Sequence, residues 1–170
     1  YCALLPWTFF SASITTGINS MVLNTNLIQQ IYFPRILFPL SAVLSSFVDF
    51  AIASLIFIAL LIFYKVQITI YVFLLIPILM LQIMFTIPLC ILGSALNVFY
   101  RDIGQGLVFI IQLWMYACPI VYPISVVPEK YRMLYTLNPM VGIIDSYRKV
   151  IIQGIAPNWD YLLISFVVTF

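Results

Sequence analysis

Long runs without a charged residue constrain this chain more than any other feature. Residues 1–34 and 66–100 contain no Asp, Glu, Lys or Arg, and the 170 residues include only 7 basic and 5 acidic side chains. Charged residues make up 7% of the sequence, against roughly 25% in soluble domains. Because so few polar side chains cannot cover a water-soluble globule, most of the surface must face lipid. We therefore expect an integral membrane protein.

The charge-free intervals place the membrane spans, because an ionised side chain is costly in hydrocarbon. They predict five spans, at about 1–22, 39–63, 70–96, 106–123 and 161–170. We expect an all-α fold, since a helix satisfies its own backbone in lipid and a β-barrel would need alternating apolar and polar residues. The sequence starts at Tyr1 and its last apolar run is short, so we expect one transmembrane domain from a longer subunit, truncated at both ends.

The connections between spans alternate between two sides of the membrane. Side X would hold residues 23–38 and 97–105, and side Y would hold 64–69 and 124–160. In the first X-side connection, apolar residues recur at helical spacing opposite polar ones until Pro34, which predicts a short amphipathic helix at about 24–34. Such a helix either lies on the membrane surface or docks onto another protein.

The long Y-side connection predicts two short helices, one on each side of a break at Asn138 and Pro139. The apolar patches that flank this break are too short to cross a bilayer, so we expect them to dip partway into the membrane or to lie on it. An ordinary surface loop is the alternative.

One face of the predicted fourth span is rich in polar and aromatic side chains. On a helical wheel this face carries Gln112, Met115, Tyr116, Pro119 and Tyr122, while Trp114 points the other way. Flat aromatic rings pack on the apolar faces of sugars and hydroxyl groups bond to their edges, so the face is a candidate lining for a glycan channel. Helix packing and an interfacial aromatic belt are the alternatives.

Three charged residues have informative positions. Asp49 is an acid well inside a span, on a stripe of small residues, where it serves either an ion relay or a polar contact with a neighbouring helix. We favour the contact, because a relay needs further titratable groups at that depth. Arg101 and Asp102 separate two long apolar runs, so they mark a membrane exit where both charges reach water or each other.

The sequence lacks the usual residues of a hydrolase or a nucleotide-binding protein. It has no His, its cysteines at positions 2, 90 and 118 form no CxxC pair, and it contains neither a GxxxxGK[ST] nor a GxGxxG loop. We therefore expect no catalytic residue, metal site, bound cofactor or nucleic-acid partner. A glycosyltransferase or phosphatase acting on polyprenyl lipids would need clustered acids or His, and the acids here are scattered.

The order of several segments gives the chain a family resemblance. "NVFYRD" is followed by a hydrophobic span, then by "YACPIVYPISVVPEKYR" and "LYTLNPMVGIIDSYRKVIIQG". Together they resemble the permease subunit of ATP-binding-cassette type-2 exporters, most of all the branch that exports O-antigen, capsule or teichoic-acid polysaccharides. The resemblance implies six spans in the full chain, a permease homodimer, a lipid-linked glycan substrate, and two separate ATPase subunits that hold ATP and Mg. A drug, haem or simple lipid is the alternative cargo.

The resemblance also assigns roles to particular residues. The amphipathic helix would be the coupling helix that docks onto the ATPase, with contacts from Asn26, Leu27, Gln29, Gln30, Phe33 and Pro34. Residues 124–154 would form re-entrant gate helices on the outer face, in a gate region that includes Pro123, Asn138, Pro139 and Arg148. Arg101 and Asp102 would be a cytoplasmic anchor, and the aromatic face of the fourth span would line the glycan channel at the dimer centre.

The resemblance places side X in the cytoplasm, with the chain crossing the bacterial plasma (inner) membrane several times. The count of basic residues points the opposite way: side X holds Arg35 and Arg101, whereas side Y holds Lys65, Lys130, Arg132, Arg148 and Lys149. We follow the resemblance, because segments beyond this sequence would add basic residues on side X. Basic residues in a folded re-entrant loop would also form contacts within the loop or bind phosphate groups of the substrate.

Side Y is therefore expected outside the cell. A cysteine introduced by Lys130→Cys in the full-length protein should react with a membrane-impermeant thiol reagent added to intact cells. Labelling of this position only from the cytoplasmic side would reverse the orientation.

Overall fold

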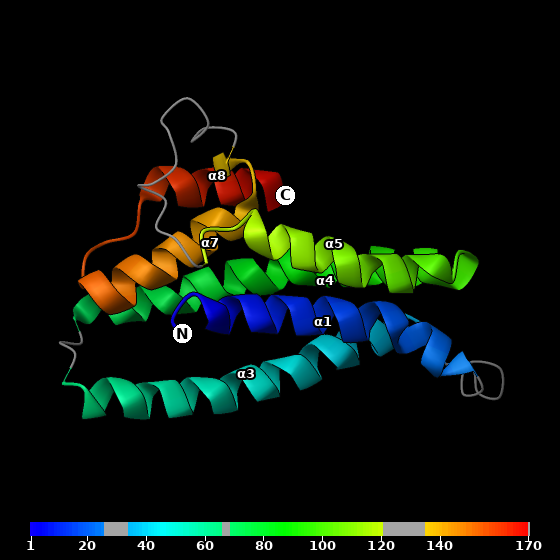
Figure 1. The fold of residues 1–170 in the computed structure, drawn as a ribbon, viewed down its shortest axis with the longest axis horizontal. Coiled ribbons are helices and arrows are strands. Elements are labelled where there is room, and N and C mark those ends of the chain that lie inside the picture. The colour runs from blue at the N-terminus through cyan, green and yellow to red at the C-terminus, as the bar shows by residue number, and fades with distance from the viewer. Residues whose placement is uncertain (26–33, 66–68, 121–134, 170) are drawn as a thin grey trace.

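The computed structural model describes residues 1–25, 34–65, 69–120 and 135–169. Within these ranges all regular structure is helical, which confirms the predicted all-α fold class. The elements are α1 (Leu4–Leu23), α3 (Leu37–Phe63), the 3-10 helix η1 (Ile70–Leu74), α4 (Leu75–Phe99), α5 (Asp102–Tyr116), α7 (Pro139–Arg148), the π-helical turn η3 (Lys149–Gln153) and α8 (Trp159–Thr169) (Figure 1).

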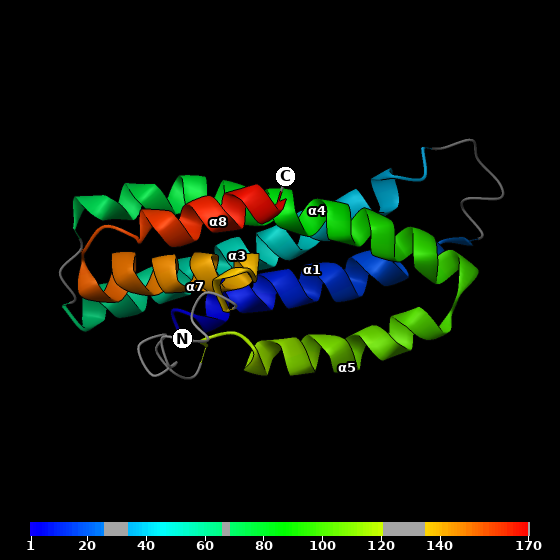
Figure 2. The same cartoon turned by 90° about the horizontal axis from the view of Figure 1, so that it is seen from above.

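The long helices lie side by side along the longest axis of the molecule (Figures 1 and 2). The end of α1 and the turn between α4 and α5 lie at one end, which we call the X end. The connections from α3 to α4 and from α7 to α8 lie at the opposite Y end. The structure thus groups the described connections as the alternate counting of spans predicts.

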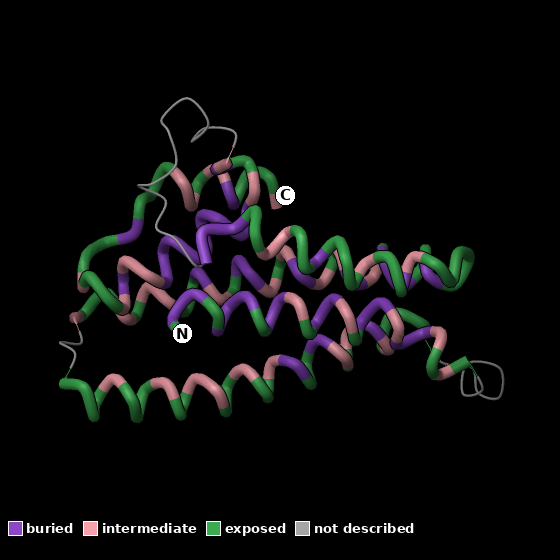
Figure 3. Tube along the Cα trace, viewed as in Figure 1, coloured by how far each residue is buried: buried purple, intermediate pink, exposed green. Residues whose placement is uncertain are grey.

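The most apolar helices are also the most exposed. Leu37–Phe63 and Ile70–Phe99 are long and apolar enough to cross a membrane, yet only 11% and 22% of their most hydrophobic windows are buried. Figure 3 shows exposed and intermediate residues alternating along α3, with buried residues only towards its first half. A core helix of a soluble protein would be mostly buried. These exposed apolar faces therefore suit contact with lipid.

Helix α5 differs from the predicted fourth span. It begins at Asp102, four residues before the predicted start at 106, and it ends at Tyr116, where a turn follows over residues 117–120. The predicted end of the span at about 123 lies outside the described residues. The reason for the early end is Pro119, which has no N–H to donate and whose ring would clash with the carbonyl of Met115. At 1.5 Å per residue the helix is about 22 Å long, less than the roughly 30 Å of a bilayer core.

Helix α1 is the buried centre of the bundle, and it packs against both α3 and α4. Glycine permits its close approach to α4. A Cβ at Gly17 would lie 3.0 Å from the Cβ and Sγ of Cys90, and one at Gly93 would lie 2.6 Å from Cδ1 of Ile18. Small residues let helix backbones come together in this way in membrane proteins.

Three polar side chains of α4 fix its register on α1. Each donates a hydrogen bond to a backbone carbonyl of α1, and we call this set the α1–α4 ladder. Its bonds run from Gln82 Nε2 to Pro6 O (2.7 Å), from Cys90 Sγ to Ser13 O (3.3 Å) and from Asn97 Nδ2 to Ile18 O (3.1 Å). Because both sets of positions rise together along the chain, α1 and α4 run parallel.

A helix follows the Asn138–Pro139 break, as the sequence predicts. The Asn138 side chain accepts a hydrogen bond from the Met140 N–H, and Pro139 occupies the first turn, where its missing N–H costs nothing. The other short helix, predicted before the break, falls mostly outside the described residues. After α7, Gly154 adopts a left-handed conformation with φ 63°, which ends the helical run.

We expect the packing of α7 on α8 to be sensitive to a single methyl group. A Cβ at Gly142 would lie 2.7 Å from the backbone carbonyl oxygen of Tyr161, so Gly142→Ala should destabilise the protein by about 1–3 kcal/mol. Denaturant unfolding in detergent measures this change. Gly106→Ala is the matched control, since nothing lies within 4 Å of its added Cβ; equal losses in both variants would contradict the close packing.

Candidate functional site

Helix α5 rests on α1 and α4 through an aromatic cluster at the middle of the bundle. Phe10 stacks on Phe85, with ring centroids 5.6 Å apart and planes inclined by 8°. The Trp114 ring meets Phe10 edge-on at 5.3 Å and Phe85 at 6.5 Å. Offset and edge-on geometries are the favoured ones for aromatic pairs, so this cluster joins three helices.

A second attachment lies at the X end. The Oδ1 atom of Asn97 accepts a hydrogen bond from the backbone N–H of Gly104 (2.9 Å), while its Nδ2 donates to Ile18 O and to Asn19 Oδ1 (3.2 Å). We call Asn19, Asn97 and Gly104 the asparagine clamp. The sequence does not predict this set, because an amide within an apolar run does not show which helix it will contact.

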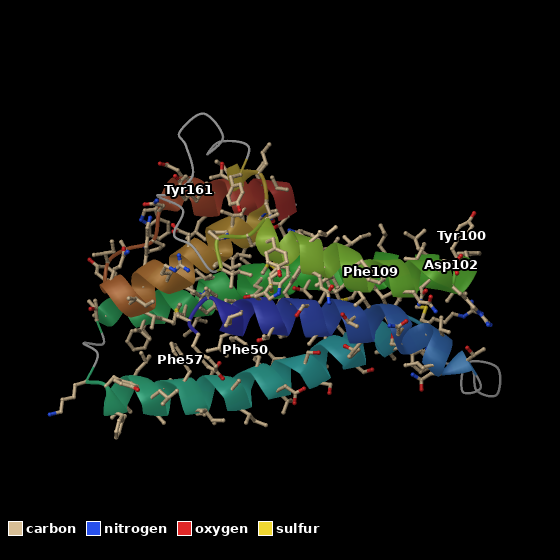
Figure 4. The ribbon with its side chains drawn as sticks, in the orientation of Figure 1. Phe50, Phe57, Tyr100, Asp102, Phe109 and Tyr161 are labelled. Atoms are coloured by element: carbon tan, nitrogen blue, oxygen red, sulfur yellow. The ribbon has the colours of Figure 1, made fainter. Side chains whose placement is uncertain are left out.

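The outward surface of α5 carries a stripe of amides and aromatic rings. Gln105, Phe109, Gln112 and Tyr116 are all exposed, and their spacing of four, three and four residues places them on one face. We call this set the α5 stripe. Phe109 and Tyr116 are 68% and 69% exposed, and Figure 4 shows Phe109 on α5, between Asp102 at the X end and the centre of the molecule.

The predicted channel face agrees with this stripe only in part. Gln112 and Tyr116 belong to it, and Trp114 points inwards as expected. Met115, however, is half-buried against the core, and Pro119 is buried, because the turn after α5 folds back towards α7. Tyr122 lies outside the described residues. Gln105 and Phe109 were missed, although the same helical period continued towards the X end would have found them.

The described residues of the predicted gate region lie close to the end of α5. Asn138 Nδ2 donates to Cys118 Sγ (3.4 Å), and Arg148 Nη2 donates to Ile120 O (2.9 Å). Residues near both ends of α7 therefore contact the turn that follows α5. Pro139 is buried at the start of α7, and Pro123 falls outside the described residues.

Helix α7 is unusually polar for a buried element. Its Asp145 forms an ion pair with Lys149 at 3.1 Å, and the Lys149 Nζ lies 5.9 Å from the centre of the Tyr161 ring on α8. Burial raises the pKa of Tyr147 above its usual range, so its phenol stays neutral. The charged side chains of Asp145 on α7 and Lys149 on η3 therefore interact with groups of the protein itself.

The remaining predicted residues lie apart from this region. Arg101 and Asp102 are exposed at the X end, where Asp102 sits in the first turn of α5 and complements the helix dipole. Asp49 is exposed near the middle of α3, and its carboxylate forms no hydrogen bond or ion pair with the described residues. Of the predicted coupling residues, Pro34 is exposed, whereas Asn26, Leu27, Gln29, Gln30 and Phe33 are outside the described ranges.

The described residues offer hydrophobic grooves rather than a reaction centre. One groove of about 270 Å³ lies between α3 and α4, and another of about 580 Å³ lies between α4 and α8. Phe50 and Phe57 project from α3 at the first of these grooves (Figure 4). Among the described residues, no group of three or more His, Cys, Asp or Glu side chains is placed to hold a metal ion.

Residues 2–152 match the model of a known family, described as ABC-2 type transporter. The chain belongs to the ABC-2 type transporter family. It is therefore a membrane protein, and its exposed apolar helices are explained by contact with lipid. The family match covers α1 to α7 and most of η3, so the aromatic cluster, the clamp and the α5 stripe all lie within it.

The chain is also similar to named permeases. It is 32% identical over 168 residues to an O-antigen export system permease protein RfbA of Klebsiella pneumoniae, covering 98% of this chain and 64% of that protein. It is 27% identical over 165 residues to the protein of the same name from Myxococcus xanthus, covering 96% and 64%. The chain thus spans somewhat less than two thirds of the length of these relatives.

The aromatic cluster should contribute strongly to stability. Replacing its indole by Trp114→Ala removes contacts with Phe10 and Phe85, so it should lower the free energy of unfolding by about 3 kcal/mol. The neighbouring Leu113 is exposed, and Leu113→Ala should change this free energy little. Unfolding by denaturant in detergent compares the two, and an equal effect of both would show that α5 does not rest on the cluster.

Proposed function

We propose that this chain is the permease subunit of an ABC exporter that moves a lipid-linked polysaccharide outwards across the bacterial plasma membrane. The polysaccharide would be of the O-antigen, capsule or teichoic-acid type. Two separate ATPase subunits supply the energy, two permease copies form the channel, and the permease breaks no bond in its substrate. Membership of the ABC-2 family and the likeness to O-antigen export permeases support this proposal.

The α5 stripe is the observation that carries the proposal. An amide moved from water into hydrocarbon without a hydrogen-bond partner costs about 2–7 kcal/mol, so Gln105 and Gln112 are poorly suited to face lipid tails. A stripe that alternates amides with aromatic rings suits a hydrated sugar chain instead, because the rings pack on sugar faces and the amides bond to hydroxyl groups. The stripe lies on the surface of α5 that the described residues leave uncovered, between the exposed apolar side chains of Val108 on one side and of Ile110 and Leu113 on the other.

In a homodimer, the α5 stripe of one copy can face the α5 stripe of the other. If the α5 helices of two copies face one another, their stripes line both walls of one central path. The exposed faces of α3 and α4 then remain towards lipid, in agreement with their apolar composition. This arrangement separates the polar surface of the bundle from its lipid-facing surfaces.

The two ends of the bundle have different roles in this mechanism. The segment at 24–34 docks onto the ATPase at the X end, which is cytoplasmic. Helix α7 forms part of an outer gate, because its contacts with Cys118 and Ile120 tie it to the end of α5. Movement of α5 therefore reaches the gate directly.

Loss of the full-length protein in its source bacterium tests the proposed cargo. A deletion strain should lose surface polysaccharide and accumulate the lipid-linked polymer inside the cell, as measured by glycan analysis of the cell surface and of membrane lipids. The full-length protein should also co-purify with a nucleotide-binding subunit. Normal surface glycan together with increased sensitivity to a small compound would favour the alternative cargo of a drug, haem or lipid.

We also expect the exposed ring of Phe109 to contact the glycan during export. An aromatic contact is worth about 1 kcal/mol, so Phe109→Ala should reduce export about fivefold without loss of folded protein. Phe73→Ala is the control, because Phe73 is equally exposed but lies on η1 at the Y end. Initial rates of export in a complemented deletion strain compare the variants; equal export from both would remove Phe109 from the path.

A further inference from the structure

A single buried amide fastens three helices together at the X end. Asn97, which is 2% exposed, bonds to the Ile18 carbonyl and the Asn19 side chain on α1. Its oxygen accepts from the Gly104 N–H in the first turn of α5. That N–H is one of the groups at a helix start that have no acceptor within their own helix. Asn97 thus caps α5 and holds α1 at the same time.

The fit around this amide is tight. A Cβ at Gly104 would lie 2.8 Å from Asn19 Oδ1 and 2.9 Å from Asn97 Oδ1, so glycine is needed for α5 to approach. Next to the clamp, Ile18 packs over Gly93 on α4. Close packing of this kind transmits displacement rather than absorbing it. The X ends of α1, α4 and α5 are therefore one mechanical unit.

In the sequence, this unit comes directly before the segment that would meet the ATPase. α1 ends at Leu23, only four residues after Asn19 and immediately before the segment at 24–34. In the proposed function, a displacement by the ATPase would reach the last turn of α1 through Asn24 and Thr25, which follow it directly in the chain. The clamp lies between that turn and the start of α5, whose far end contacts the gate.

We propose that Asn97 is the positioning residue that makes the start of α5 move with the last turn of α1. This inference rests on the proposed function, and it adds the route by which the ATPase moves the α5 stripe. The aromatic cluster and the clamp both tie α5 to α1 and α4, so α5 moves together with these two helices when the last turn of α1 is displaced. Packed elements with shared hydrogen bonds are the physical means by which such coupling travels.

A matched pair of variants separates this role from simple stability. Gln82 and Asn97 are both buried amides of α4 that donate to an α1 carbonyl, but only Asn97 also bonds to α5. In the full-length complex in proteoliposomes, Asn97→Ala should reduce glycan exported per ATP hydrolysed by about tenfold while ATP hydrolysis continues. Gln82→Ala should leave that ratio close to wild type. A wild-type ratio in Asn97→Ala, or an equal fall in both variants, would overturn the proposal.

A second measurement does not depend on export. Spin labels can be placed on cysteines introduced by Thr16→Cys on exposed α1 surface and by Gly106→Cys, where a Cβ meets no atom within 4 Å. In the otherwise wild-type complex, the distance between labels should stay narrow and unchanged on addition of ATP. In Asn97→Ala it should broaden and shift with ATP. If the distance changes with ATP in the complex that retains Asn97, the clamp is refuted. If the distance stays rigid but the complex exports no glycan, only the proposed function is refuted.

Discussion

Hydrogen bonds from α4 side chains to the backbone of α1 are the constraint on which the rest of the bundle depends. In a lipid environment helices gain little from hydrophobic association, so packing and interhelical polar contacts decide how they pair. The α1–α4 ladder at Gln82, Cys90 and Asn97 sets both the direction and the register of this pair. Because α1 and α4 run parallel, α3 has to return between their ends. α5 then has a fixed two-helix surface on which to lie.

The sequence predicts the helical segments well, because charge is costly in hydrocarbon and its absence marks each apolar run. It also predicts the start of α7, since Asn138 and Pro139 combine a capping side chain with a proline suited to a first turn. It does not predict the ladder or the clamp. The pattern shows that Asn97 is polar, but its partners Ile18 and Gly104 depend on how three helices assemble.

The candidate site shows the same division between local and tertiary information. Helical periodicity correctly separates Trp114 from Gln112 and Tyr116, because that separation depends on α5 alone. It misplaces Met115 and Pro119, whose burial depends on the turn after α5 and on the nearby α7. The role of Asp49 stays a prediction, and its exposure on α3 means that any polar contact must come from outside the described residues.

The burial of α1 has a consequence for how the protein is made. Unlike α3 and the η1–α4 segment, α1 is not among the described helices that are long and apolar enough to count as membrane spans; Ser, Thr and Asn interrupt its apolar residues. The α1 carbonyls that bond to α4 meet partners that lie 76, 77 and 79 residues later in the chain. The register of α1 in the bundle is therefore fixed only once α4 has been synthesised.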